Sequence, residues 1–431
     1  MSSQPDVTSF ADGLVEESFD EAAFLWRRWE DELTSLTRNL DEVWSWTEDR
    51  LHGALDGVRV AGSRLTDVVA SGLRSDELNR VTVSAALLSS SEDPRAAQAL
   101  AAALEDAEGP ALRAIVRGVE LLGAGASARA AIGVLGARGP EGGGELCRLK
   151  AFRRVTAGSE LATAFDSGIP EAQVGVMRAA SCLPPPQAQE WIEAGLRSAT
   201  LAVQSAAVEA GVGRGIDAAW RTAVHQASPL DPMAAPYLKL LALLGASDEH
   251  EIIYAALRVP VLQIPAIWAL GHLGTARAVE ACLAGMQYEP LARACGEAYC
   301  WITGADLSRD RLAKAETLPD TPAFEDDDLD ADLVPPPEAL WPMPDPEAVQ
   351  RHWQVRQAGV EAGARYVLGW PASMHTVLTG IETGPMLRRP DLVLELRART
   401  RGQYDVETRA FTARQREMMA AGRPAISGSG R

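Results

Sequence analysis

Lysine is nearly absent from this chain, and aromatic residues make up only 6% of it. Among 431 residues there are three lysines, so arginine carries almost all of the positive charge, which we attribute to codon usage in a GC-rich genome. Acidic residues outnumber basic ones by 59 to 41, which gives a net charge of −18. That charge argues against nucleic acid or anionic lipid as a partner unless a basic face forms locally.

Long apolar runs and targeting signals are missing too. No stretch of 18 or more apolar residues occurs, so the sequence predicts no membrane insertion. The first six residues, 1–6, have neither a basic region nor an apolar run, so we expect no secretory signal. The five cysteines include no C-x-x-C pair, which favours reduced thiols in a cytoplasmic protein.

The sequence contains no motif of known chemistry. There is no G-x-S-x-G elbow and no H-E-x-x-H helix, and the six histidines are scattered singly. The glycine-rich stretches 123–126 and 211–215 follow no strand and complete no phosphate-binding loop, so we interpret them as helix ends. Residues 139–144 are interpreted as a flexible joint. We therefore expect no catalytic residue and no cofactor.

A metal site was considered for one group of residues. His272, Cys282, Cys295 and Cys300 could meet across neighbouring repeats. Zinc sites usually pair their ligands at short spacing, however, and Cys295 and Cys300 lie on different faces of one predicted helix. We therefore interpret these cysteines as buried structural thiols and expect no metal.

A helical pattern repeats between residues 80 and 304. Helices rich in small residues are expected at 170–183, 200–212, 232–244, 261–273 and 290–302, so that successive starts lie about 30 residues apart. Second helices are expected between them at 187–198, 217–226, 248–257 and 275–286, with weaker copies at 81–88, 94–104, 112–122 and 128–135. A pair of this size cannot bury its own apolar face, so the pairs must stack on one another. The fold class predicted is all-α, an α-solenoid of short HEAT-like helical-hairpin repeats.

The N-terminal region predicts two helices within residues 20–57. Leucine and tryptophan recur at spacings of three and four, and we expect Asp20 and Asp41 to cap the two helices. Four tryptophans within 21 residues favour a hydrophobic cap on the array, and a ligand surface is the alternative.

Charge is segregated after residue 304. Residues 315–350 contain 11 acidic side chains and no basic one, together with many prolines, and predict an extended linker. Residues 351–431 carry 13 arginines against 7 acids, a net charge of +6. Unless this distribution arose by chance, it predicts contact between the tail and the acidic body or linker, within one chain or between chains.

These observations divide the chain into six parts. We expect a disordered N-terminus (1–19), an N-terminal helical cap (20–79), the repeat solenoid (80–304), an acidic proline-rich linker (305–346), a helical arginine-rich C-terminal domain (347–423) and a disordered tail (424–431).

Several short segments, taken together, resemble a bacterial family. They are Glu21-Ala-Ala-Phe-Leu-Trp26, residues 51–62, residues 296–307, Trp341-Pro-Met-Pro-Asp-Pro346, residues 363–371 and Arg414-Gln-Arg416. Their order and content are similar to a family of HEAT-like repeat proteins of proteobacteria and myxobacteria whose genes often accompany the type VI secretion system. The chain departs from the family pattern at His352-Trp353, where a Trp pair is usual, and at Gly384-Pro385.

The sequence predicts a cytoplasmic, non-enzymatic scaffold for protein–protein interaction, since solenoids act through extended surfaces. The resemblance implies an accessory role in type VI secretion, such as loading or neutralising a secreted effector or secretion component. A bilin-lyase-like enzyme, or another small-molecule-handling protein, is the alternative. The residues expected to form a docking patch are Trp341, Met343, Trp353, Arg365, Tyr366 and Trp370.

Overall fold

The computed structural model describes residues 7–315 and 341–428. The chain has an all-α, solenoid-like fold, as the sequence predicts, and a two-stranded hairpin is the only sheet in the described part. It divides into two compact units: unit 1 comprises Met1–Trp220 and Ile381–Arg431, and unit 2 comprises Arg221–Gly380. The predicted C-terminal domain, 347–423, is therefore shared between the two units.

Unit 1 contains the N-terminal helices, four complete helical pairs from α5 to α12, helix α13 and the last helices of the chain. Its helices are α1 (Val7–Glu32), α2 (Leu40–Val43), α3 (Asp49–Arg59), α4 (Leu65–Val69), α5 (Leu78–Ser89), α6 (Pro94–Asp106), α7 (Gly109–Leu122), α8 (Gly125–Ala137), α9 (Gly139–Phe152), α10 (Glu160–Asp166), α11 (Pro170–Ala180), α12 (Pro185–Leu196), α13 (Leu201–Val212), α22 (Arg389–Arg399) and α23 (Thr412–Gly428). A π-helical turn, Trp44–Glu48, joins α2 to α3, and short 3₁₀ turns lie at Gly62–Arg64, Ala70–Arg74 and Met386–Arg388.

Unit 2 continues the alternation of helices and adds the hairpin. Its helices are α15 (Ala235–Leu244), α16 (Ser247–Ala256), α17 (Gln263–Leu273), α18 (Ala276–Gly285), α19 (Glu289–Thr303) and α20 (Pro346–Arg356). The strands are β1 (Tyr366–Val367) and β2 (Trp370–Pro371), which pair antiparallel. Short 3₁₀ turns lie at Pro232–Ala234, Pro260–Leu262 and Gln357–Gly359, and α14 (Asp217–Ala227) and α21 (Met374–Thr383) span the unit boundaries.

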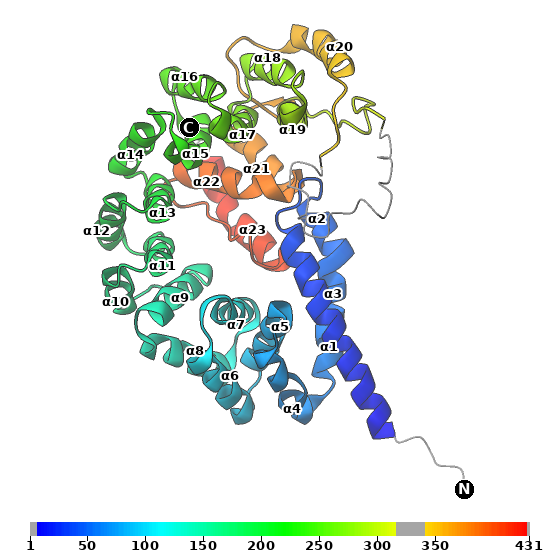
Figure 1. Cartoon of the computed structure of the whole chain (residues 1–431), viewed down its shortest axis with the longest axis vertical. Coiled ribbons are helices and arrows are strands. Elements are labelled where there is room, and N and C mark those ends of the chain that lie inside the picture. Colours follow the sequence, from blue (N-terminus) through cyan, green and yellow to red (C-terminus); the bar gives the residue numbers. More distant parts are fainter. Residues whose placement is uncertain (1–6, 316–340, 429–431) are drawn as a thin grey trace, which may run out of the picture. The chain divides into compact units, whose positions relative to one another are not determined.

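Alternate helices of unit 1 stack in series. Each of α5, α7, α9 and α11 packs on the next odd-numbered helix, and α6 packs on α8 in a second layer (Figure 1). The odd-numbered helices begin 30 or 31 residues apart, at residues 78, 109, 139, 170 and 201, which confirms the predicted spacing. Buried apolar side chains of α9 to α13 form one continuous cluster, so each of these pairs is stabilised by its neighbours.

Glycine allows two of these helices to approach closely. A Cβ added at Gly175 in α11 would lie 2.3 Å from the carbonyl oxygen of Gly144 in α9, closer than atoms can approach. The prediction of a flexible joint at 139–144 is therefore wrong, because these residues begin α9 and pack on Ala172 and Ala164. The two other glycine stretches do follow helix ends, at Leu122 and Val212, as predicted.

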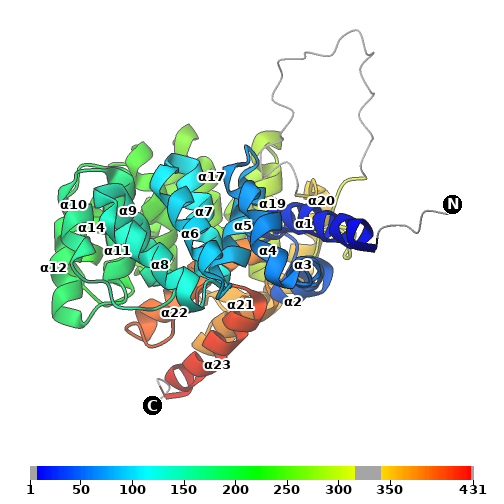
Figure 2. The ribbon, with the colours of Figure 1, turned by 90° about the horizontal axis from the view of Figure 1, so that it is seen from below.

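The N-terminal region differs in detail from the prediction. Helix α1 begins at Val7, so Asp20 lies within it and does not cap it; burial of Val15 and Phe19 extends the apolar face of the helix into the stretch expected to be disordered. Helix α2 is capped by Asn39 rather than Asp41, in a capping box with Glu42. Helices α1 and α3 lie side by side (Figure 2).

The end of the chain packs within unit 1. Helix α23 continues through Pro424 to Gly428, so residues 424–428 are helical, whereas the sequence predicts a disordered tail. The predicted contact between tail and body is present within the chain: Arg409 lies 3.9 Å from Glu120, and Arg416 pairs with Asp41. The predicted linker, 305–346, lies mostly outside the described residues.

No single helix of the described residues is long and apolar enough to cross a bilayer. The pair Ser247–Ala256 and Pro260–Leu273 has that length and composition jointly but is bent by 117° at the break.

Candidate functional site

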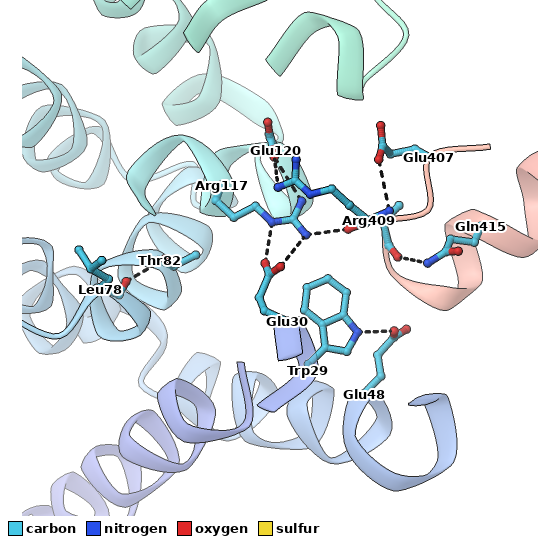
Figure 3. A network of polar contacts seen from close by, with 11 residues as sticks. Trp29, Glu30, Glu48, Leu78, Thr82, Arg117, Glu120, Glu407, Arg409 and Gln415 are labelled. Atoms are coloured by element: carbon cyan, nitrogen blue, oxygen red, sulfur yellow. Dashed lines mark hydrogen bonds and ion pairs between the residues drawn. The ribbon is translucent and has the colours of Figure 1, made fainter. Parts of the chain in front are cut away.

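Unit 1 contains a buried ion network around Arg117 of α7. Its guanidinium nitrogens contact Glu30 Oε1 at 2.6 Å, Glu120 Oε2 at 3.2 Å and the carbonyl oxygen of Arg409 at 2.7 Å (Figure 3). Burial alone would lower the pKa of Arg117, but the two carboxylates outweigh burial and raise it. The network joins α1, α7 and the segment before α23.

A second buried group, Glu48, holds the start of α23. Its carboxylate accepts hydrogen bonds from the Trp29 indole at 2.9 Å and from the backbone amide and hydroxyl of Thr412 at 2.8 and 2.9 Å. The side chain of Glu48 is fully buried. Since Arg117 and Glu48 are already engaged by protein groups, we interpret both as a clamp that fixes the C-terminal segment.

Unit 2 contains a cavity of about 220 Å³ that is open on one side. Its walls come from the start of α18, the end of α19, α20 and the hairpin. Apolar side chains dominate the lining: Val279, Ile302, Trp353, Val360 and Tyr366. Arg356, the last residue of α20, also lines the cavity.

The hairpin is fixed to two helix ends by its backbone. Tyr366 N donates to the carbonyl oxygen of Gly274 after α17, and Leu368 and Gly369 donate to Trp301 and Ile302 near the end of α19, at 2.8–2.9 Å. These carbonyls lack partners inside their own helices, so the hairpin supplies the missing donors. The hairpin, which forms one wall of the cavity, is thus hydrogen-bonded to the ends of α17 and α19.

Near Arg356, Tyr299 and His352 form a hydrogen-bonded pair. His352 precedes Arg356 by one turn of α20, and the charge of Arg356 affects the pKa of His352. The Tyr299 hydroxyl is 2.5 Å from His352 Nδ1. Burial raises the pKa of Tyr299, so its hydroxyl stays protonated and donates to the imidazole. Burial also lowers the pKa of His352, and the positive charge of Arg356 lowers it further, whereas Asp310 raises it. Both groups are therefore neutral at pH 7.

The structure brings together part of the predicted docking patch. Trp353 and Tyr366 line the cavity and are buried, whereas Trp370 is not a lining residue but follows the lining residue Gly369 in the chain and is 69% exposed. Arg365 donates to the carbonyl oxygen of His272 at 2.7 Å, so it helps to attach the hairpin.

The other two predicted residues lie elsewhere in unit 2 and are not among those that line the cavity. Trp341 is buried, and its carbonyl oxygen accepts from Arg293. Met343 is half-buried, and its carbonyl oxygen accepts from Lys314 N at 2.8 Å. Burial gives Trp341 and Trp353 roles in the core, which leaves Trp370 as the exposed aromatic of the predicted patch.

Sequence reasoning missed Arg356 and the contribution of α18 to the cavity. Arg356 is one of 13 arginines in residues 351–431, and no motif in the sequence sets it apart from the others. Val279 and Ile302 were assigned only to repeat cores. The sequence contains one indication of its role: Arg356 lies three residues after Trp353, a spacing that places both side chains on the same face of a helix.

The cysteines and histidines are dispersed in the structure. Cys282 and Cys295 are buried, and burial raises the pKa of the Cys300 thiol. Within residues 7–315 and 341–428 no group of three or more histidine, cysteine or acidic side chains is placed to hold a metal ion.

These features place the chain among all-α proteins built from stacked helical pairs. It matches no protein-family model and no curated protein. Among solved structures it is similar to the crystal structure of an engineered protein, with 16% identity over 69% of this chain and 90% of that chain, and a TM-score of 0.25.

Proposed function

We propose that this chain is a non-enzymatic scaffold for protein–protein interaction of the HEAT-like kind, which acts in the cytoplasm as an accessory to type VI secretion. It would load or neutralise a secreted effector or secretion component. The proposal rests on the exposed Trp370, which follows the cavity-lining Gly369 in a hairpin attached to stacked helices. Exposed aromatic side chains are frequent anchors of protein interfaces.

The size of this cavity favours a single side chain of a protein partner over a drug-sized ligand at this place in unit 2. Pockets for drug-sized ligands usually measure about 300–1,000 Å³. The cavity of about 220 Å³ is smaller, so a tetrapyrrole of the kind handled by bilin lyases would not fit inside it. One amino-acid side chain would fit.

The test is affinity capture of the tagged full chain from the native host, followed by reconstitution with each purified candidate. We expect a protein that binds wild type directly and binds Trp370→Ala at least tenfold more weakly. Tyr288→Ala is the matched control, because it removes another exposed aromatic of unit 2 whose neighbours in the chain do not line the cavity. A tetrapyrrole that co-purifies in place of any protein would contradict the proposal.

Co-expression distinguishes the two roles. If the partner is toxic and this chain restores growth, the role is neutralisation; if secretion of the partner rises, the role is loading. Because the chain is strongly acidic, we also expect the partner to bind more weakly as salt rises. A dissociation constant that does not change with salt would contradict the electrostatic contribution to binding but not the scaffold function.

A further inference from the structure

Within the part of the chain that the structure describes, Arg356 has no acidic partner, although acidic residues exceed basic ones in the sequence. No carboxylate of the described residues forms an ion pair or a hydrogen bond with its guanidinium. Five residues earlier on the same helix, Arg351 pairs with Glu347 at 3.7 Å. The charge of Arg356 is therefore available at the cavity.

The guanidinium lies against the hairpin backbone. A Cβ added at Gly369 would be 3.2 Å from Arg356 Nη2, so the two groups are almost in contact. Gly369 has φ of +82° and lies between Arg356 and the carbonyl oxygen of Thr303, a place that only glycine fills without strain. The guanidinium of this exposed residue thus lies at the edge of the cavity.

A second feature that favours an anion lines the same cavity. Ala276 is the first residue of α18, a helix of ten residues. The amide groups of a first helical turn have no acceptor within the helix and carry partial positive charge. Thr275 Oγ1 accepts from one of them, Ala278 N, at 3.2 Å, which leaves the amides of Ala276 and Arg277. Arg356 and the start of α18 therefore both favour negative charge here.

The remaining walls fit an apolar group. Val279, Ile302, Trp353 and Val360 supply hydrocarbon and ring surface, with no acidic side chain among the lining residues. An apolar cavity of about 150 Å³ accommodates a benzene ring. The volume of about 220 Å³ therefore suits one leucine or phenylalanine side chain with a carboxylate next to it.

We propose that this cavity binds the C-terminal residue of a partner polypeptide. The apolar side chain of that residue enters the cavity, and its main-chain carboxylate pairs with Arg356 and the first amides of α18. This proposal rests on the proposed function and names the part of the partner that is recognised. A polypeptide end carries an apolar side chain and a carboxylate on one carbon atom, which is the pairing that the cavity presents.

The direct test uses two synthetic peptides and the full-length chain. One is N-acetyl-Gly-Ser-Gly-Leu with a free carboxylate, and the other is the same peptide as its amide. We expect the free acid to bind at least tenfold more tightly by titration calorimetry or ligand-observed NMR. Equal affinities, or no binding of either peptide at millimolar concentration, would overturn the proposal.

Two variants locate the binding. Arg356→Gln is expected to lower the affinity for the free acid to that of the amide. Arg351→Gln removes the same charge from the same helix and is expected to bind as wild type does. Both arginines are exposed, so both variants should fold. If the two variants bind alike, Arg356 is not the carboxylate partner.

The partner itself separates this proposal from the proposed function. Four residues added to the C-terminus of the captured partner should abolish its binding. Binding that survives this extension overturns the C-terminal proposal and leaves the scaffold function standing. If no partner is captured but the free-acid peptide binds through Arg356, the cavity proposal stands and the scaffold function fails.

Discussion

Arg153 Nη2 lies 2.7 Å from the carbonyl oxygen of Gly123, thirty residues earlier in the chain. The relationship recurs: Arg138 donates to Ala107 at 2.6 Å, and Arg214 donates to Leu183 at 2.7 Å, each across 31 residues. Each arginine follows one helix and bonds the last carbonyls of the parallel helix one pair earlier. A cation at a helix C-terminus also offsets the negative end of the helix dipole.

These arginines are expected to stabilise the stacking of pairs. Hydrogen bonds from a charged donor contribute about 1.5–3 kcal/mol when buried, and half-burial reduces that to about 1–2 kcal/mol. We therefore expect Arg138→Met to lower the free energy of unfolding by about 1–2 kcal/mol in urea denaturation. Arg129→Met, at an exposed position of helix α8, which Arg138 follows, should change it by less than about 0.5 kcal/mol. Equal effects of the two variants would show that the carbonyl contacts contribute nothing.

The repeat was predictable because its physical cause is local. Proline and glycine mark where helices begin and end, and the pairs expected at 170–183 and 187–198 match α11 and α12 within three residues. Helix α1 was misjudged because Val15 and Phe19 are buried by tertiary packing, which its polar neighbours in sequence do not reveal. The same holds for glycines 142–144, since only contact with α11 tells a helix crossing from a hinge.

The candidate site was only partly predictable. Tryptophans drew attention to 341–370, but the sequence does not say which of them is buried. Trp353 is buried and Trp370 is exposed, and only the packing of α20 and the hairpin determines which of the two is buried. The cavity also needs Val279 from a helix more than 70 residues before Trp353, a pairing that no local pattern contains.

The crossing of α9 and α11 requires glycine at 175. Gly175→Ala would place a methyl group 2.3 Å from the carbonyl oxygen of Gly144, so the helices must separate. We expect a loss of about 1–3 kcal/mol in the free energy of unfolding. Gly133→Ala is the matched change in α8, where no atom lies within 4 Å of the added Cβ, and it should stabilise the protein by about 0.5–1 kcal/mol. If both substitutions raise the free energy of unfolding, the close crossing of α9 and α11 is refuted.

Glu48 is expected to control the attachment of α23. Glu48→Ala would leave the Trp29 indole and both donors of Thr412 buried without an acceptor. At about 1–3 kcal/mol for each orphaned group, a loss of at least about 3 kcal/mol follows. Hydrogen exchange should show faster exchange in residues 412–428. Asp49→Asn, at the exposed neighbouring position, serves as control, and unchanged protection of α23 in Glu48→Ala would disprove the clamp.

The imidazole of His352 should titrate below its usual value of 6.5. Burial is the main cause, and the charge of Arg356 adds to it, against the opposing effect of Asp310. Because the folded state disfavours the protonated ring, His352 destabilises the fold as pH falls from 6.5 through its folded pKa, and its contribution is constant below that. NMR titration of wild type should give a pKa under 6.5.

Arg356→Gln should raise the pKa of His352, while burial keeps it below 6.5. Arg351→Gln should change the pKa of His352 less than Arg356→Gln does, because Arg351 is not among the groups that shift it. A carboxylate bound at Arg356 would raise the same pKa, so the titration also reports occupancy of the cavity. A wild-type pKa at or above 6.5 would contradict the burial of this ring.

The two tryptophans of the predicted patch should respond in opposite ways to removal. Trp353 is 4% exposed and packs in the cavity wall, so Trp353→Ala should lower the free energy of unfolding by about 3–5 kcal/mol. Trp370 is 69% exposed, so Trp370→Ala should change stability by less than about 0.5 kcal/mol and act on partner binding instead. Urea denaturation and a binding titration on the same samples separate the two effects. If Trp370→Ala unfolds the protein as readily as Trp353→Ala does, Trp370 belongs to the core and is not available to a partner.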